Sequence, residues 1–328
     1  MKVCVLGAGA VGSWLAAKLA MTGEDVTLVA RGEQFAAIDA NGIELDEGKF
    51  GKTTARVSRL VRDLASAEGC DVVVVALKAY QLAAVADQLG HLASRGAFIL
   101  SLQNGFPWWY FQGVVTQKSV THLESVDPGG KLFKALPQGT VVGGVAYVAA
   151  EVTKPGQVKV AGKGRLVMGE PDGQDSGRLQ ELAALLQRCG IAAEPVMDIR
   201  CHVWAKLWRN AAFNPVSCVT RATLGGIAAD AGMAPVLEAL LDEVAQVAAA
   251  FGISINESAT DLISSSIRFG MHKTSMLQDL ERGRSLELDA MVGAVIELAG
   301  SAGIRVPHLN TVFVCARLAE KSARVSVN

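Results

Sequence analysis

The first residues of the chain constrain its fold more than any other stretch. A short apolar run, Val3 to Leu6, is followed by the glycine pattern G-x-G-x-x-G and then by Ser13 to Met21, whose apolar spacing is that of a helix. A strand, a glycine loop and a helix in this order form the phosphate-binding unit of doubly wound α/β folds. The stretch therefore predicts a dinucleotide site, and a tight βα turn that binds nothing is the alternative.

The three glycines of this loop have different tasks. Gly7 permits the tight turn, Gly9 lets the backbone approach a pyrophosphate, and Gly12 lets the helix pack closely on the strand. The phosphates would lie at the helix N-terminus, where unpaired N–H groups and the helix dipole favour an anion. We expect cofactor contacts from Gly7, Gly9, Ala10, Val11 and Gly12.

Arg31 follows the next predicted strand, Val26 to Ala30, and stands 19 residues after Gly12. An NAD or FAD site usually has Asp or Glu here, whereas a guanidinium suits the 2′-phosphate of NADP. A solvated arginine at a strand end is the other interpretation. Because no carboxylate stands before Glu33, the sequence favours NADP over NAD and FAD.

Composition excludes several classes of function. The net charge of −1 gives no basic surplus for nucleic acid or an anionic membrane surface. Six scattered cysteines form neither a disulfide framework nor a zinc site, and five histidines contain no metal-binding motif, so we expect a reducing cytoplasm and no metal. No apolar run reaches the roughly 18 residues that span a bilayer.

The pattern of elements changes near residue 196. Strands and helices alternate up to that point, which predicts a mostly parallel sheet covered on both faces, with antiparallel pairs at 43–57 and 141–169. Beyond it, long helices are predicted over 199–219, 232–251, 256–271 and 286–302. With 328 residues, half of them hydrophobic, we expect a Rossmann-type domain over 1–196 and an all-helical domain over 197–328.

The helical part begins with a polar row. Lys206, Asn210 and Asn214 are spaced i, i+4 and i+8, so they lie along one helix face, among mostly apolar neighbours. The wet side of an amphipathic helix would explain this spacing, but two asparagines lower the helix propensity, which a merely solvated face has no reason to accept. Pro215 predicts a kink or an end of the helix just after the row.

Four further polar residues are candidates for a site. Lys78 and Asn104 follow predicted strands at the carboxyl edge, where such sheets bind ligands, although Asn104-Gly105 is also an ordinary turn signal. Ser275 begins a capping-box pattern with Gln278, and Glu287 stands at the start of a helix, so both also have structural explanations.

In their order along the chain these motifs resemble the ketopantoate reductases (2-dehydropantoate 2-reductases), from Lys2 to about Val314. The resemblance rests on the glycine loop, Arg31, Ala76-Leu-Lys78, Gln103-Asn-Gly105, Lys206-Leu-Trp-Arg-Asn210, Asn214-Pro215, Thr274-Ser-Met276 and Glu287-Leu-Asp289.

The resemblance implies an oxidoreductase that reduces a 2-oxo acid with NADPH, namely ketopantoate to pantoate in pantothenate biosynthesis. It makes Lys206 the proton donor. It places Asn104, Asn210, Asn214, Ser275 and Glu287 at the substrate, with Ser275 on the carboxylate end and Glu287 on the hydroxyl. Arg31, Lys78 and Asn104 would face the cofactor. A homodimer is a further expectation.

Residues 106–138 are irregular and aromatic, with Trp108, Trp109 and Tyr110 adjacent. Contiguous exposed aromatic side chains usually mark a ligand or partner surface, so we expect a lid or wall over the substrate, with a subunit interface as the alternative. This segment leaves open a bulkier 2-oxo acid as substrate. A non-catalytic NADP-sensing regulator is a further alternative, but it would be expected to lack the row that begins at Lys206.

Overall fold

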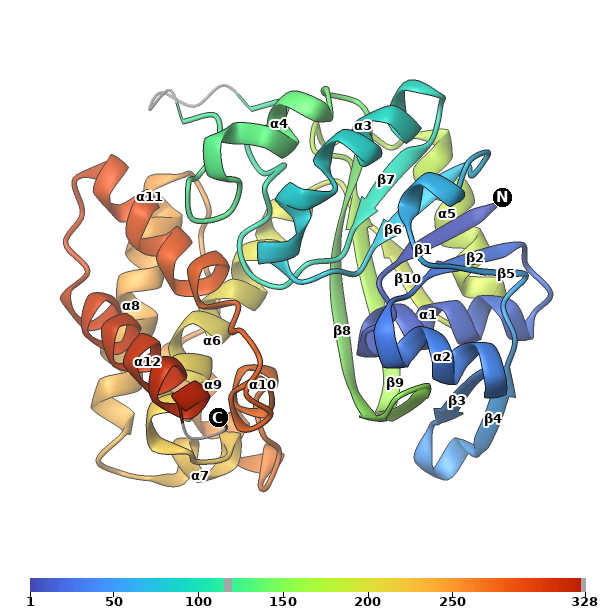
Figure 1. Ribbon diagram of the computed structural model, residues 1–328. Coiled ribbons are helices and arrows are strands. Elements are labelled where there is room, and N and C mark those ends of the chain that lie inside the picture. The colour runs from blue at the N-terminus through green and yellow to red at the C-terminus, as the bar shows by residue number, and fades with distance from the viewer. Residues whose placement is uncertain (115–119, 326–328) are drawn as a thin grey trace. The chain divides into compact units, whose positions relative to one another are not determined.

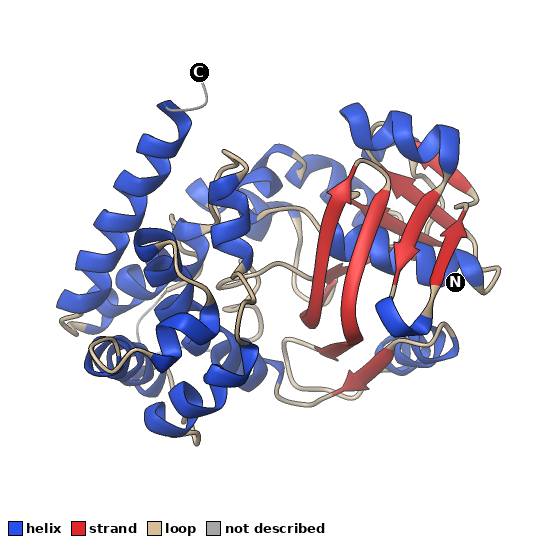
Figure 2. Ribbon diagram, turned by 90° about the horizontal axis from the view of Figure 1, so that it is seen from below, coloured by secondary structure: helices blue, strands red, loops and turns tan. Residues whose placement is uncertain are grey.

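The computed structural model describes residues 1–114 and 120–325, and these form two compact units (Figure 1). The first unit comprises Met1–Gln103, Trp109–Val114 and Gly129–Ile199. The second comprises the described residues of Asn104–Trp108, Val115–Pro128 and Arg200–Asn328. The chain therefore enters the second unit for the first time directly after Gln103, long before its main crossing at Ile199. All the strands, red in Figure 2, belong to the first unit.

A single mixed sheet organises the first unit. Its strands are β1 Val3–Leu6, β2 Val26–Val29, β3 Ile43–Asp46, β4 Lys52–Ala55, β5 Arg59–Val61, β6 Val72–Val75, β7 Phe98–Ser101, β8 Val141–Lys154, β9 Gln157–Gly169 and β10 Ala192–Pro195. The order is β4-β3-β9-β8-β7-β6-β1-β2-β5, with β10 beside β9. Only β3 with β4 and β8 with β9 are antiparallel among the described pairs. The predicted mostly parallel α/β sheet is confirmed.

The centre of this sheet is covered on both faces. Every residue of β1 and β6 is buried, as expected for parallel strands between two layers of helices. One face packs against α1 (Ala10–Met21) and α5 (Gly177–Arg188), whose Trp14 and Leu182 belong to the same core as β1. Helix α3 (Ala86–Ser94) packs against another strand of the sheet, β7.

The sequence predicted some of the remaining helices and missed others. The first unit also contains α2 Gly32–Asn41 and α4 Lys131–Ala135. The second unit contains α6 Ile199–Thr220, α7 Leu224–Ala229, α8 Ala234–Ala250, α9 Ala259–Ser266, α10 Ser275–Glu281, α11 Ala294–Ala302 and α12 Pro307–Val325. The helices α4, α7 and α12 were not predicted from the sequence. Within the described residues, no helix is both long and apolar enough to cross a bilayer.

Pro215 does not end α6. The helix continues beyond it to Thr220, so of the two predicted outcomes, a kink or an end of the helix, the end does not occur. A proline inside a helix removes one backbone hydrogen bond and costs about 3 kcal/mol or more. Residues 211–218 are all buried, and their packing outweighs that local cost.

The aromatic segment is buried, which contradicts the expectation of an exposed surface. Trp108, Trp109 and Tyr110 are only 4%, 1% and 3% exposed. Trp108 belongs to the second unit and Trp109 to the first. The Trp109 ring packs directly on Gly143 of β8. A Cβ added to Gly143 would lie 2.4 Å from the ring atoms of Trp109. Residues 115–119 of the predicted insertion lie outside the described residues.

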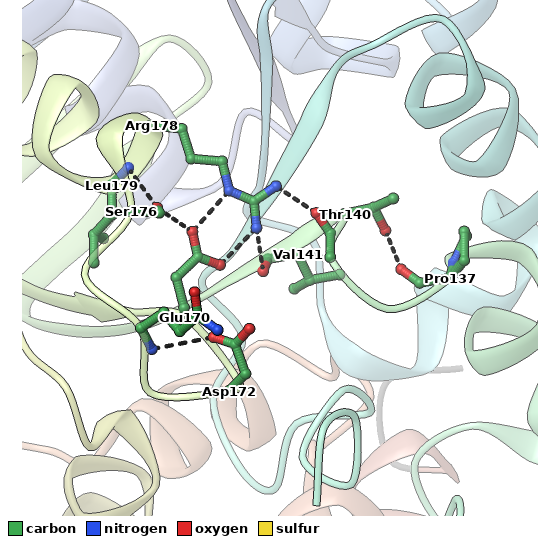
Figure 3. A network of polar contacts seen from close by, with 10 residues as sticks. Pro137, Thr140, Val141, Glu170, Asp172, Ser176, Arg178 and Leu179 are labelled. Carbon is green, nitrogen blue, oxygen red and sulfur yellow. Dashed lines mark hydrogen bonds and ion pairs between the residues drawn. The ribbon is translucent and has the colours of Figure 1, made fainter.

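An ion pair between a half-buried arginine and a buried carboxylate holds α5 at the end of the sheet (Figure 3). Glu170, 4% exposed, follows β9 and accepts hydrogen bonds from Arg178 Nε and Nη2 at 2.7 and 2.5 Å. Ser176 Oγ donates to the same carboxylate, and Arg178 also donates to the carbonyl oxygen of Val141 in β8. Such a carboxylate needs these partners because an unpaired buried charge is strongly destabilising.

Candidate functional site

The glycine loop has the geometry that its pattern predicts. Gly7 has φ +108°, a conformation that residues with a side chain rarely adopt. A Cβ on Gly12 would lie 1.9 Å from the Gly7 carbonyl oxygen, so only glycine allows this approach of helix and loop. A Cβ on Gly9 would meet nothing within 4 Å, which leaves the outer side of the loop open to a ligand.

The N-terminus of α1 is open to an anion. Gly9 is its N-cap residue, no side chain caps it, and its first turn contains no acidic residue. Ala10 and Val11 are half-buried in that turn. Free backbone N–H groups and the positive end of the helix dipole are the features that bind phosphates, so the loop fits a dinucleotide pyrophosphate.

Arg31 is exposed directly beyond β2, and a second arginine accompanies it. Arg31 Nε donates to the carbonyl oxygen of Arg62 at 3.2 Å. Arg62 follows β5, which pairs in parallel with β2, and its guanidinium lies 3.8 Å from the centre of the Phe35 ring. Two exposed guanidinium groups thus stand at the carboxyl ends of neighbouring strands, where a phosphate could be bound by a fork of donors.

Two other polar side chains mark the carboxyl ends of central strands. Lys78 is half-buried and follows β6, where its backbone N–H donates to Gln81 Oε1 at 3.0 Å. Gln103 follows β7, and its Nε2 atom is buried with no hydrogen-bond partner among the described residues. A buried N–H group without a hydrogen-bond partner destabilises the folded protein, and a ligand bound at this edge of the sheet could supply the missing acceptor.

Lys206 and Asn104 are brought together although 102 positions separate them in the sequence. Lys206 Nζ donates to Asn104 Oδ1 at 2.7 Å, and both residues belong to the second unit. Asn104 is therefore more than a turn residue, because its amide oxygen orients the lysine amine.

Burial changes the acidity of Lys206. It lowers the pKa of this lysine from 10.5 to about 8, and the negative charge of Glu287 opposes the change. Glu287 itself is only 5% exposed. An ammonium with a pKa near 8 is a suitable general acid at neutral pH, since the best catalytic pKa lies near the working pH.

The other two residues of the predicted row lie with Lys206 on α6. Asn214 is buried and its Nδ2 donates to Met291 Sδ at 3.3 Å. Asn210 is half-buried, and its amide makes no hydrogen bond to any described residue. The row therefore presents one amide that is held in place and one that is available to a ligand.

Ser275 is not the helix cap that its pattern predicted. Thr274 caps α10 instead, because its Oγ1 accepts the N–H of Leu277 at 3.1 Å. Thr274 Oγ1 also donates to Ser217 Oγ on α6 at 3.2 Å. Gln278 reaches the Lys273 carbonyl rather than the cap. The exposed Ser275 hydroxyl is left available one position further on.

Sequence reasoning missed Arg62, Met291 and the unsatisfied amide of Gln103. Arg62 was missed because β5 is only three residues long and was not predicted. Met291 carries no polar signal, and only the folded helix places its sulfur at Asn214. Gln103 stood within the motif that ends at Gly105, and its position after a strand could have identified it.

Comparison with known families gives two adjoining matches. The family described as ketopantoate reductase PanE/ApbA matches residues 3–173. The family described as the C-terminal part of ketopantoate reductase PanE/ApbA matches residues 198–320.

Individual proteins are similar over nearly the whole chain. The 2-dehydropantoate 2-reductase of Mesorhizobium japonicum is 39% identical over 97% of each chain. The 2-dehydropantoate 2-reductase of Archaeoglobus fulgidus is 31% identical over 92% of each chain. A solved structure from Ralstonia solanacearum MolK2, described as a candidate ketopantoate reductase, has a TM-score of 0.91 at 34% identity and covers 98% of both chains.

Proposed function

Because the chain belongs to the ketopantoate reductase family, we propose that it reduces the ketone of 2-dehydropantoate to the alcohol of pantoate, with NADPH as the electron donor. The observation that carries this proposal is the 2.7 Å hydrogen bond between Lys206 and Asn104, beside the buried carboxylate of Glu287. This arrangement holds one acidic proton at a fixed place, which is what reduction of a ketone requires from the protein.

The first unit would bind the cofactor. Its glycine loop, Gly7 to Gly12, and the open N-terminus of α1 would hold the pyrophosphate. Arg31, supported by Arg62, would bind the 2′-phosphate, and this pair is the reason for proposing NADPH rather than NADH. Lys78 would contact the cofactor from the carboxyl end of β6, and Asn104, which belongs to the second unit, would also contact it.

The second unit would supply the acid. When bound, the reduced nicotinamide supplies a hydride to the carbonyl carbon. Lys206 Nζ donates a proton to the carbonyl oxygen, so the C=O double bond becomes CH–OH and the ammonium becomes an amine. The amine then regains its proton from water. At pH 7 a pKa of about 8 leaves the lysine mostly protonated and ready to donate.

The remaining polar groups would orient the substrate. Asn210, whose amide has no partner among the described residues, would donate a hydrogen bond to the substrate, and Asn214, held by Met291, would complete the polar row on α6. The exposed Ser275 hydroxyl would bind the carboxylate end of the substrate. Glu287 would accept a hydrogen bond from the substrate hydroxyl and hold the lysine in its charged form. Fixed donors and acceptors of this kind add specificity because an unmatched ligand leaves them unsatisfied.

The experiment is NADPH oxidation by the purified protein against 2-oxo acids of increasing side-chain size, with 2-dehydropantoate included. We expect 2-dehydropantoate to have the highest kcat/KM. Lys206→Ala should reduce kcat by about 10²–10⁴-fold with NADPH affinity unchanged, since general-acid catalysis contributes that much. Lys321→Ala, at an exposed lysine of α12, is the control and should match wild type. A loss below about tenfold for Lys206→Ala would remove the lysine from the role of acid.

No observation now favours a bulkier substrate. That alternative rested on the aromatic residues near Trp108, and these are buried within the chain's own two units. The sensor alternative is not favoured either, because Lys206, Asn210 and Asn214 all lie on α6 and Lys206 is paired with Asn104.

We also propose that two copies of the chain associate through α12. This helix packs its inner face against α8 and α10, while Val314 and Leu318, one turn apart, are 64% and 62% exposed. Neighbouring exposed apolar side chains mark interaction surfaces. A second copy is the occupant we propose, because a solved structure of this fold is described as a dimeric ketopantoate reductase from Staphylococcus aureus, and a two-fold contact would pair Val314 and Leu318 with the same residues of the other copy.

A further inference from the structure

One turn of the second unit departs from ordinary helix geometry. Asp289–Gly293 forms a π-helical turn that leads into α11. The Ala294 N–H donates to the carbonyl of Asp289, five residues back, and not to Ala290 as it would in an α-helix. The carbonyl oxygen of Ala290 instead accepts the backbone N–H of Phe106 at 2.7 Å. Such turns occur frequently at functional sites.

The residue before Phe106 lies against the same carbonyl. Gly105 has φ +84°, and a Cβ there would lie 2.5 Å from the Ala290 oxygen and 2.7 Å from its carbonyl carbon. Those are backbone atoms and cannot move aside as a flexible side chain could. Two successive residues, Gly105 and Phe106, are thus fixed to Ala290, immediately after Asn104.

The π-turn and its neighbours also reach the polar row of α6. Met291 Sδ accepts the hydrogen bond from Asn214, and the Phe106 ring packs edge-on against Trp204 with 5.9 Å between the ring centres. Trp204 is fully buried two residues before Lys206. The segment after Asn104 therefore contacts α6 before Lys206, through Trp204, and the π-turn contacts α6 after Lys206, through Asn214.

We propose that the π-turn Asp289–Gly293 is the positioning element that sets the Asn104 amide against the Lys206 amine. Gly105 and Ala290 are then positioning residues that act through Asn104, and the extra residue of the π-turn exists to free the Ala290 carbonyl. The inference rests on the proposed function for its catalytic consequence, but the placement of the Lys206 amine can be measured without any ligand.

The direction in which the pKa of Lys206 should change follows from this geometry. A hydrogen bond from the Lys206 ammonium to Asn104 Oδ1 favours the charged form of the lysine. Moving Asn104 away removes that stabilisation, so the pKa of Lys206 should fall below its present value. Misplacement of a catalytic group by about 1 Å can cost about 10²-fold in rate.

A double-mutant cycle tests whether Gly105 acts through Asn104. We expect Gly105→Ala and Asn104→Ala each to lower kcat by about 10–100-fold. In the Asn104→Ala background, adding Gly105→Ala should cost less than about twofold more, because the group it displaces is already gone. Titration of the Lys206 amine by ¹⁵N NMR in the cofactor-free protein should give a lower pKa in all three variants.

Gly303→Ala is the matched control. Gly303 has a similar backbone conformation, φ +68°, but a Cβ there would meet nothing within 4 Å. This variant carries the same kind of backbone strain and should change neither kcat nor the Lys206 titration. If Gly105→Ala does not fold, Ala290→Val takes its place in the double-mutant cycle. The larger side chain crowds the same Gly105–Ala290 contact, because the Ala290 Cβ would lie 3.1 Å from a Cβ on Gly105.

Additive losses in the double variant, or an unchanged Lys206 titration in Gly105→Ala, would overturn the positioning role. Failure of the proposed function looks different. In that case wild type would reduce none of the 2-oxo acids, while the NMR titration would still report whether Gly105 and Asn104 act on the same lysine.

Discussion

Burial of Lys206 disfavours its ammonium form, and Glu287 opposes that effect without cancelling it, so the pKa is about 8 rather than 10.5. Because only the ammonium can donate a proton, kcat/KM should be constant at lower pH and fall as pH rises through about 8. Glu287→Gln removes the opposing charge, which lowers the pKa of Lys206 further. The alkaline limb of the pH profile should therefore move to lower pH.

Glu281→Gln is the control for this profile. Glu281 forms an exposed ion pair with Lys273 at 2.7 Å on α10, so its loss removes a charge without approaching Lys206. We expect its alkaline limb to coincide with that of wild type. A limb that stays in place or moves upward in Glu287→Gln would contradict the electrostatic role of this carboxylate.

Arg31 should decide the choice between the two nicotinamide cofactors. Arg31→Asp replaces a donor fork by a negative charge that repels the 2′-phosphate, so NADPH binding should weaken by at least about 10²-fold and NADH binding much less. Arg95→Asp makes the same charge change at an exposed residue after α3 and should leave both affinities near wild type. Titration calorimetry with each cofactor measures both, and equal losses for NADPH and NADH in Arg31→Asp would remove the phosphate role.

For single residues, the sequence predicted the helix on which the polar side chains lie but not the contacts that they make. The spacing of Lys206, Asn210 and Asn214 placed them on one helix, as the structure has them. Spacing along a helix could not reveal that Asn104 bonds Lys206, because that contact depends on the whole fold. The cap was misplaced by one position, since Thr274 and Ser275 are chemically equivalent candidates and only the backbone geometry decides between them.

Elements with a clear apolar pattern were predicted, and those that depend on tertiary packing were not. The strands β1 and β6 are short uninterrupted apolar runs, so their burial follows directly from the sequence. In contrast, the sequence did not predict α12, a helix that leaves Val314 and Leu318 exposed. The π-turn at Asp289–Gly293 has no local signal, because its geometry is completed by a contact from Phe106.

Trp109 should contribute to the stability of the first unit rather than to the choice of substrate. Its ring is 1% exposed and fills the space above Gly143 of β8. Trp109→Ala should lower the free energy of unfolding by about 3–5 kcal/mol, as large-to-small changes of buried aromatic residues do. Urea denaturation measures this. Phe50→Ala, at a residue 51% exposed, should cost less than about 1 kcal/mol.

An unchanged free energy of unfolding for Trp109→Ala, together with a new order of preference among 2-oxo acids, would restore the idea of a substrate wall. The packing argues against that outcome, because a cavity of tryptophan size in a unit held by one sheet cannot close without moving β8.

Across the whole molecule, the proposed chemistry is divided between two units by the path of the chain. The glycine loop and Arg31 belong to the first unit, and Lys206 and Glu287 to the second. Asn104 belongs to the second unit although its sequence neighbours up to Gln103 belong to the first. A single boundary near residue 196, read from the pattern of elements, does not describe the five residues Asn104–Trp108, which belong to the second unit.

The proposed association of two chains through α12 predicts that a charge on this helix separates them. Leu318→Lys places a charge at one of the two exposed apolar residues of α12, where a two-fold contact would bring it close to its own copy. Desolvation and like-charge repulsion should then shift the mass measured by light scattering from that of two chains to that of one. Val236→Lys, at a 41% exposed position of α8, is the control and should keep the mass of wild type. A wild-type protein with the mass of a single chain, or a Leu318→Lys variant that stays dimeric, would contradict an interface on α12.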